Sequence, residues 1–276
     1  MDILLLGSSA KEHALAWKFA ESRKTGTIYT SSPYAGVDTL ADSWQDRADA
    51  WRAAHPDGLV LGERDGFRYP EDSAKPAKKC VSLPCLYDGK TVLTLPAVQI
   101  QQEDAVYSAF APAQNMTQAM IEDVLSRIVL PWLQAQEERG VFCFSFSDDA
   151  DLQLLSIHYG FGEMEAMAVL PMLRGELAGL LLACENGTLH SMTVPLNGTA
   201  TAVYPYHTEI GAPLSGLSRI AMNTGFFIGA AEKKEDQLYA LDPYPLYLCG
   251  RASTLDDAMR AADTARSILA EIHQTK

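Results

Sequence analysis

ILLLGSSAKEHALAW, residues 3–17, predicts a buried strand, a tight turn and the beginning of a helix. The short apolar run ends at Gly7, as is typical of a strand in a parallel sheet covered on both faces. The turn offers Ser8 or Ser9 as the N-cap of the helix, and Glu12, three residues after Ser9, completes a capping-box pattern. The stretch therefore predicts the first β-α turn of a parallel α/β sheet.

The residues that follow continue this alternation of strands and helices. Residues 28–30 and 58–62 are further short apolar runs, and residues 39–54 have the spacing of an amphipathic helix. This order predicts a small doubly wound parallel sheet, so we expect a Rossmann-like lobe over residues 1–70. Residues 63–79 are rich in charge, glycine and proline without periodicity, and they predict a linker or long loop.

The remaining chain predicts a second, larger unit with mixed elements. Residues 80–102 form a hairpin pattern, because Asp88-Gly89 between two apolar runs is a strong turn signal. We expect helices over residues 117–139, 164–184 and 255–273, and strands over residues 141–146 and 152–157. The fold class is therefore α/β.

The overall composition excludes several classes of protein. The chain has 276 residues, of which 47% are hydrophobic, enough to bury a core without disulfides or a structural metal. Its net charge of −13 argues against nucleic-acid binding, which needs clustered basic residues. Its five scattered cysteines are typical of reduced thiols in a cytoplasmic protein. Since no apolar run approaches the ~18 residues of a bilayer span, and no signal peptide is evident, we expect no membrane association.

Three segments of the first lobe carry a resemblance when they are taken in order. They are LGSSAKEHALAW (residues 6–17), PYAG (residues 33–36) and DGLVLGE (residues 57–63). Together they resemble the strand, Gly-Ser-Gly-Gly-Arg-Glu-His-Ala-type turn, loop and later strand that open the phosphoribosylamine–glycine ligases. That family consists of ATP-dependent enzymes of purine biosynthesis. The resemblance identifies the first lobe as the Rossmann-like lobe that precedes an ATP-grasp unit.

The resemblance extends along nearly the whole chain. GFGEMEAM (residues 160–167) is similar to the family's Arg-Phe-Gly-Asp-Pro-Glu-x-Gln motif and is the strongest match. Residues 86–92 resemble a hairpin of the family's ATP-grasp unit, and residues 248–258 resemble its closing strand and helix. The resemblance implies a remnant of the ATP-grasp second lobe over residues 78–190. It also implies a small C-terminal β-rich domain over residues 191–276, ending in a helix.

Departures from the family pattern concern its ATP chemistry. Only sixteen residues separate Gly62 from Lys79, where the family carries its first ATP-grasp lobe, and an extended segment of that length spans at most about 55 Å. The positions of the family's magnesium ligands hold Ser156 and His158, although Mg²⁺ prefers carboxylate oxygens. The family's arginine is replaced by Gly160, which removes a cation beside phosphate. We therefore expect no cofactor and no metal; ATP and magnesium are expected only if the chain is an active ligase.

The turn after the first strand is the first candidate ligand site. Backbone amides of Gly7, Ser8 and Ser9 at a helix N-terminus suit an anion, and Lys11 would add a direct contact with a phosphate. Alternatively, the turn serves only the fold, because side chains in place of the family's glycines would crowd a ligand near the backbone.

Five further residues are candidates, each with a structural alternative. Glu163 and Glu165 would bind a cation or would only stabilise the start of a helix. His158 is either a ligand-binding group or a hydrogen-bonded histidine of the interior. Tyr204 and His207 indicate either a remodelled pocket or an interface.

Three functions follow from these observations. The first is a non-catalytic or repurposed relative of the ligases, a small-molecule-binding or partner subunit that has lost the ATP-grasp activity. The second is a shortened but active phosphoribosylamine–glycine ligase, and the third is a different enzyme with a cleft rebuilt around His158, Glu163, Tyr204 and His207. We expect a homodimer or a partner protein to cover the face left by the missing lobe, and a small phosphorylated metabolite is a candidate ligand.

Overall fold

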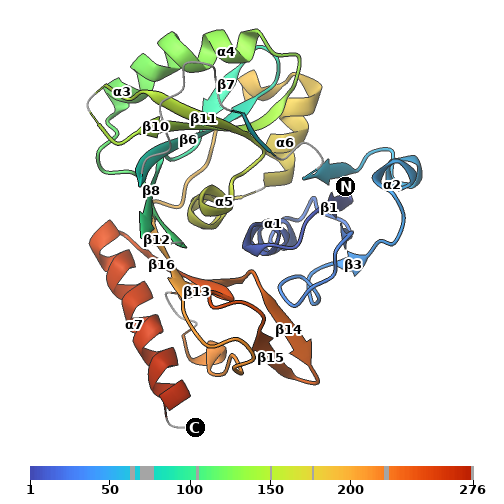
Figure 1. Cartoon of the computed structure of the whole chain (residues 1–276). Coiled ribbons are helices and arrows are strands. Elements are labelled where there is room, and N and C mark those ends of the chain that lie inside the picture. The colour runs from blue at the N-terminus through green and yellow to red at the C-terminus, as the bar shows by residue number, and fades with distance from the viewer. Residues whose placement is uncertain are drawn as a thin grey trace.

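The first 62 residues form the parallel sheet that the sequence predicts. The computed structural model describes residues 1–62, 66–68, 78–103, 106–149, 151–175, 177–220 and 224–274. The four strands of the N-terminal sheet run parallel in the order β3-β2-β1-β4, and helix α1 follows β1 directly (Figure 1). The elements are β1 (Ile3–Leu5), α1 (Ala10–Ala20), β2 (Ile28–Thr30), β3 (Asp42–Ser43), α2 (Ala48–Ala54) and β4 (Leu59–Leu61).

One helix of this unit is shorter than the sequence predicts. A helix over residues 39–54 was expected, but α2 begins only at Ala48, and residues 42–43 form strand β3 instead. The backbone N–H of Trp44 donates to the carbonyl oxygen of Thr30 at 2.9 Å, which holds this segment extended along β2. The prediction was therefore wrong in its first half, because pairing with a neighbouring strand outweighed the local helical spacing.

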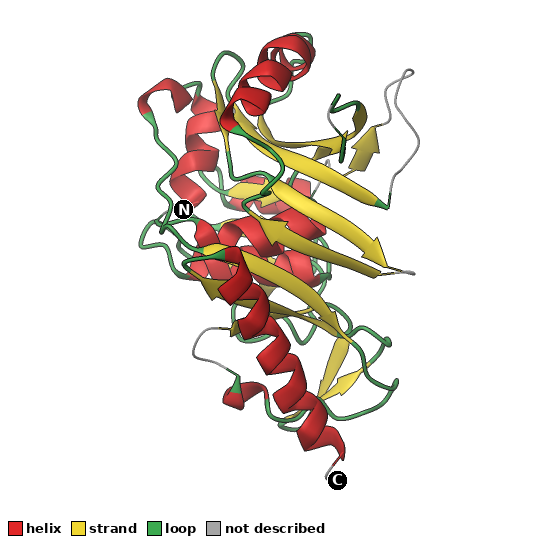
Figure 2. Ribbon diagram, turned by 90° about the vertical axis from the view of Figure 1, so that its left-hand side faces the viewer, coloured by secondary structure: helices red, strands yellow, loops and turns green. Residues whose placement is uncertain are grey.

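A large antiparallel sheet forms the body of the molecule. Its strand order is β13-β16-β12-β9-β8-β6-β10-β11-β5, with β7 paired to β6. Figure 2 draws the strands in yellow. Strand β5 lies within the predicted linker, whose other residues, apart from Lys78 and the first residue of β6, fall outside the described ranges. The strands are β5 (Gly66–Arg68), β6 (Lys79–Tyr87), β7 (Val92–Thr94), β8 (Val98–Glu103), β9 (Val106–Ala111), β10 (Gly140–Ser147), β11 (Leu154–Tyr159), β12 (Ala200–Tyr206), β13 (Thr224–Ile228) and β16 (Leu246–Ala252).

The predicted Asp88-Gly89 turn closes the hairpin between β6 and β7. The Asp88 carboxylate accepts from the backbone N–H of Lys90 at 2.9 Å and of Thr91 at 2.6 Å. Gly89 has a φ of +94°, a conformation that favours glycine. The same carboxylate also accepts from the N–H of Leu189 at 2.9 Å, so the turn ties the hairpin to a distant segment.

Helices cover both faces of the central strands. One face packs against α3 (Gln118–Val124), a π-helical turn (Leu125–Val129) and α4 (Leu130–Gln134), which together account for most of the helix predicted over residues 117–139. The other face lies toward α5 (Glu163–Val169) and α6 (Leu177–Asn186), with α1 beside them in the middle of the molecule (Figure 1).

The single helix predicted over residues 164–184 is interrupted. Helix α5 passes into a 3₁₀ turn at Leu170–Met172, and α6 begins only at Leu177. Pro171 and Gly175, which has a φ of +107°, are poor residues for a helix interior. In the break, the N–H of Arg174 donates to the carbonyl of Pro195 at 2.7 Å, so the chain bonds elsewhere.

The C-terminal part shares the large sheet. Strand β12, from the unit predicted over residues 191–276, pairs with β16 of the same unit and with β9 of the unit predicted over residues 78–190. One sheet therefore runs through both predicted units. A small hairpin, β14 (Ala231–Lys234) and β15 (Gln237–Ala240), lies outside this sheet. Helix α7 (Leu255–Gln274) corresponds to the helix predicted over residues 255–273, and it packs along β16 and β12. The described residues contain no helix that is long and apolar enough to cross a membrane.

Candidate functional site

One face of the large sheet is polar where β6, β10 and β11 run side by side. The phenylalanines of residues 142–146 point toward α3 and α4, so the alternate side chains of β10 point to the opposite face. The register pairs Ser145 with Ser82 on β6 and with Ser156 on β11. The small polar side chains of this face are Cys80, Ser82, Cys143, Ser145, Ser147, Ser156 and His158.

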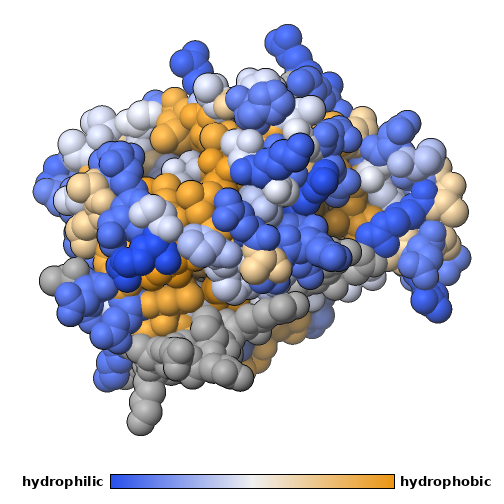
Figure 3. Space-filling view, turned by 90° about the horizontal axis from the view of Figure 1, so that it is seen from above, coloured by the Kyte–Doolittle hydropathy of each residue, from blue (hydrophilic) through white to orange (hydrophobic). Residues whose placement is uncertain are grey.

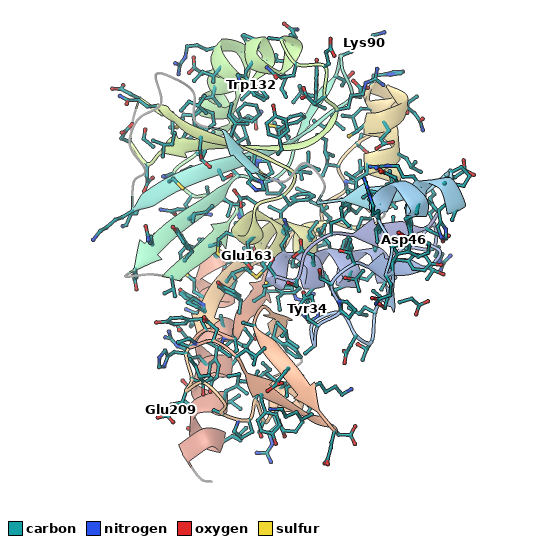
Figure 4. The ribbon with its side chains drawn as sticks, turned by 45° about the vertical axis from the view of Figure 1, so that its right-hand side comes forward. Tyr34, Asp46, Lys90, Trp132, Glu163 and Glu209 are labelled. Atoms are coloured by element: carbon teal, nitrogen blue, oxygen red, sulfur yellow. The ribbon has the colours of Figure 1, made fainter. Side chains whose placement is uncertain are left out.

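A pocket of about 490 Å³ lies over this polar face, at the N-terminal ends of α1 and α5. Its volume lies within the range of small-molecule sites, about 300–1,000 Å³. Figure 4 shows Glu163, the first residue of α5, near the middle of the molecule. The pocket brings together five of the residues selected from the sequence, namely Ser9, Lys11, His158, Glu163 and Glu165.

The N-terminus of α1 is capped by groups of this same chain. Ser9 is the N-cap, and Glu12 completes the capping box, since its Oε2 accepts from the Ser9 N–H and Oγ–H at 2.8 Å each. The Lys11 N–H donates to the Ser9 Oγ at 3.2 Å. The Ala10 N–H donates to the Glu163 Oε1 at 3.2 Å, across 153 residues of sequence. These turn amides are therefore bonded internally.

The Glu163 carboxyl is largely buried and lies near Glu12 and Lys11. Burial raises the pKa of its carboxyl, and the nearby Glu12 raises it further, while the hydrogen bonds from Ala10 and Ser9 and the charge of Lys11 act in the opposite direction. The Lys11 Nζ lies 3.3 Å from the Glu12 Oε1, so the charge of Lys11 is already countered. Tyr34 donates its hydroxyl to the carbonyl of Ser9, and burial together with both glutamates raises the pKa of Tyr34.

Glu165, two residues after Glu163 on α5, also lines the pocket. Its side chain is 5% exposed, and its Oε1 accepts from the Ser82 hydroxyl at 2.6 Å. Cys80, next to Ser82 on the polar face, has a thiol pKa raised to about 12 by burial, and then by Glu165 and Asp148. The Cys80 thiol is therefore protonated at neutral pH.

His158 and two serines form the floor of the pocket. The Nδ1 of His158 lies 3.2 Å from the carbonyl oxygen of Gly160, which fixes the orientation of the ring. Ser145 and Ser156 face each other across β10 and β11, and each is 8% exposed. Within the described residues, no protein group forms a hydrogen bond with either serine hydroxyl.

The other candidate residues lie outside this pocket. Gly7, with a φ of +133°, packs against the Glu12 carboxyl, and Ser8 is exposed. Tyr204 packs against the ring of Phe110 and the guanidinium of Arg266, and the ring of His207 packs against Tyr244. None of these residues lines the pocket that contains His158 and Glu163.

Sequence reasoning missed several residues that line pockets. Cys80, Ser145 and Tyr107 contribute to the site, and the strict alternation of Phe with Cys or Ser over residues 142–147 is the signal that could have found Ser145. A second pocket of about 420 Å³ shares Lys11 with the first and is also lined by Arg52, Arg139 and Glu185. Parts of three segments that carry the family resemblance, residues 6–17, 57–63 and 160–167, line that pocket, although the sequence offered no reason to place them around one cavity.

The arrangement of possible metal ligands is sparse. The positions of the family's magnesium ligands, Ser156 and His158, lie two residues apart on β11 and present a hydroxyl and an imidazole. Among the described residues, no three or more His, Cys, Asp or Glu side chains form a group suited to a metal ion.

Comparisons with known proteins point to one family. No family model matches the chain. The phosphoribosylamine–glycine ligase of Rhizobium meliloti is 25% identical over 203 residues, which is 66% of this chain and 48% of that protein. The enzyme of the same name from Listeria monocytogenes is 26% identical over 163 residues, 54% of this chain and 39% of that protein. The chain thus spans less than half the length of these curated relatives.

Solved structures share the fold at low sequence identity. A crystal structure of phosphoribosylamine–glycine ligase from Thermotoga maritima superposes with a TM-score of 0.70 and 14% identity, covering 98% of this chain and 96% of that chain. N5-carboxyaminoimidazole ribonucleotide synthetase from Thermus thermophilus superposes with a TM-score of 0.63 and 13% identity, covering 98% of each chain. The mixed fold, with one parallel and one large antiparallel sheet, is that of these purine-biosynthesis enzymes.

Proposed function

We propose that this chain, which belongs to the phosphoribosylamine–glycine ligase family, is a non-catalytic member that binds a small molecule or serves as a partner subunit. It is related to ligases of purine biosynthesis, and its relatives are named for joining phosphoribosylamine and glycine. In this proposal the ATP-dependent step has been lost, together with the first ATP-grasp lobe, and the pocket over the polar face of the sheet has been kept for binding.

The main support is the state of the α1 N-terminus. A β-α turn binds phosphate through its free backbone amides and the positive end of the helix dipole. Here the amides of Ser9 and Ala10 donate to the carboxylates of Glu12 and Glu163. A phosphate at this turn would have to displace two carboxylates, and it would be repelled by them if they remained nearby.

The metal positions support the same proposal. Phosphoryl transfer depends on magnesium ions that bridge the phosphates and neutralise the charge that develops during transfer. Ser156 and His158 stand where the resemblance places the magnesium ligands, and neither offers the carboxylate oxygens that magnesium prefers. The residues present do not fit the Mg²⁺–ATP group, so no step through that group is assigned to this chain.

The first test is a direct assay of ligase chemistry. We expect calorimetric titration with Mg²⁺–ATP to show no binding tighter than about 1 mM, a binding free energy of about −4 kcal/mol. We also expect no release of ADP in the presence of glycine and phosphoribosylamine, with the Rhizobium meliloti ligase as the active control. Sub-millimolar ATP binding coupled to turnover would overturn the proposal.

An active, shortened ligase is the second candidate. It is favoured by the superposition on the Thermotoga maritima ligase, which extends over 96% of that chain. This function predicts that the chain, expressed as soluble protein, restores growth of a purine auxotroph that lacks the ligase. Soluble expression without growth would exclude it.

A further inference from the structure

The pocket floor presents two serine hydroxyls to which no group of the described residues bonds. Ser145 and Ser156 are each 8% exposed, lie opposite each other in the sheet, and have no hydrogen-bond partner among the described residues. Neither Oγ is among the fully enclosed side-chain atoms without a partner, so both hydroxyls open toward the pocket, where water or a ligand can bond to them. Because both line the same cavity and lie opposite each other in paired strands, one ligand group placed over that face of the sheet can bond to both.

Among the described residues that line the pocket, carboxylates outnumber lysine and arginine side chains. Glu163 and Glu165 line it, and neither forms an ion pair with a lysine or arginine of the described residues. Lys11 is the one lysine or arginine among the described residues that line the pocket, and its ammonium is paired with Glu12. The pocket therefore attracts a positive group and repels an anion.

The remaining lining is apolar. Ile100, Leu155 and Met164 contribute hydrocarbon surface, and the ring of Tyr107, 43% exposed, lies at the pocket. An apolar wall opposite a few convergent polar groups is the usual composition of a small-molecule site. An exposed aromatic ring is also a favourable neighbour for an organic cation.

From these three features we infer that the pocket binds an organic amine: a protonated nitrogen on a compact apolar body without phosphate. The ammonium donates hydrogen bonds to the hydroxyls of Ser145 and Ser156 and faces the Glu165 carboxylate, while the body lies against Ile100 and Leu155. This inference rests on the proposed binding function and names its ligand class. It departs from the phosphorylated metabolite that the family resemblance suggested, because the lining carboxylates oppose phosphate.

The test is calorimetric titration of the full chain with probes matched in shape and different in charge. Three sets serve: tryptamine, tryptophol and indole-3-acetate; phenethylamine, phenethyl alcohol and phenylacetate; cyclohexylmethylamine, cyclohexylmethanol and cyclohexanecarboxylate. In at least one set we expect the amine to bind about tenfold or more tighter than the alcohol, and the carboxylate weakest, as expected of hydrogen bonds to a charged group. A carboxylate that binds as tightly as its amine, or no amine binding in any set, overturns the inference.

Variants locate the binding. Glu165→Gln removes the negative charge but keeps the size of the side chain and an acceptor for Ser82. We therefore expect it to remove most of the preference for the amine over the alcohol. Glu163→Gln removes the other carboxylate charge and is the second variant of this kind. Ser145→Ala with Ser156→Ala should weaken amine binding about tenfold. Glu232→Gln, on the distant hairpin where Glu232 pairs with Lys234, is the matched control and should change nothing. Unchanged preference in both glutamate variants contradicts the inference.

The two proposals fail in different ways. ATP turnover in the ligase assay would defeat the proposed function whatever the amine titrations give. Absence of amine binding in a chain without ATP turnover would defeat only the ligand class.

Discussion

At the scale of single residues, Glu163 occupies a backbone amide of another helix that an anion could otherwise bind. Placed at the start of α5, it was open to two interpretations from sequence, a cation ligand or a helix-stabilising charge. In the structure its Oε1 accepts from the Ala10 N–H of α1, so it acts on a helix other than its own. A carboxylate at that position satisfies an amide that would otherwise be available to an anion.

His13 gives a prediction at the same scale. Its Nδ1 accepts from the backbone N–H of Ile228 at 2.9 Å, and its ring packs edge-on against Phe226 and Phe227. Burial lowers the pKa of His13 to about 4 from its ordinary value of 6.5. Between about pH 6.5 and pH 4, His13 is therefore protonated in the unfolded chain and neutral in the folded one. The neutral, buried His13 contributes its full share of the free energy of unfolding above about pH 6.5, and this share decreases as the pH falls toward 4.

We expect this contribution to amount to about 2 kcal/mol between pH 7 and pH 4.5, from the size of the pKa shift. The measurement is urea unfolding at both pH values for the wild type, for His13→Gln, and for His207→Gln, whose histidine is exposed. The His13 variant should lose this part of the pH dependence, and the His207 variant should keep it. An identical pH dependence in the wild type and in His13→Gln would contradict the prediction.

At the scale of elements, the contact between α7 and the sheet is unusually close. Gly250, on β16, faces α7 so tightly that a Cβ there would overlap the carbonyl oxygen of Ala258 and lie 2.8 Å from the backbone nitrogen of Ala262. These are backbone atoms of the helix, which cannot rotate away as a flexible side chain can. The glycine therefore sets the distance between α7 and the sheet.

We expect Gly250→Ala to lower the free energy of unfolding by about 1–3 kcal/mol, the usual cost of overpacking. Gly225→Ala is the matched control, because Gly225 pairs with Cys249 on the neighbouring strand and a Cβ there meets nothing within 4 Å. Chemical denaturation of both variants is the measurement. Equal stability losses in the two variants would show that α7 is not packed in this way.

At the scale of the whole molecule, α1 joins the parallel sheet to the large one. It contacts α5, α6 and β13, and it contributes Ser9 and Lys11 to the lining of the candidate pocket. Figure 3 shows hydrophobic residues gathered between hydrophilic ones on the face seen from above. Apolar surface of this kind favours association, since each Å² removed from water contributes about 25 cal/mol.

We propose that the chain forms a homodimer that covers the face left by the missing lobe. Light scattering should give twice the mass of one chain, which is 30.1 kDa. The protein concentration should be about 100 μM. A dimer with a dissociation constant of about 1 μM, which corresponds to a binding free energy of about −8 kcal/mol, is then largely formed. The mass of a single chain at that concentration would contradict the proposal.

The sequence alone determined those features whose causes lie within a few residues. The capping box of Ser9 and Glu12, the turn at Asp88-Gly89 and the terminal helix were predicted and are present. Each depends on local hydrogen bonds or on a short hydrophobic period, so its signal is complete within one segment. The family resemblance likewise came from short motifs in a fixed order.

Only the tertiary structure decided which residues line the candidate pocket. Glu163 meets Ala10 across 153 residues, and Ser145 faces Ser156 because two strands pair in one register. The short strand β3 also depended on another segment, since Trp44 bonds to Thr30 of β2. Local spacing cannot specify such contacts, because they are set by which strands and helices pack together, and that is settled by the burial of the whole chain.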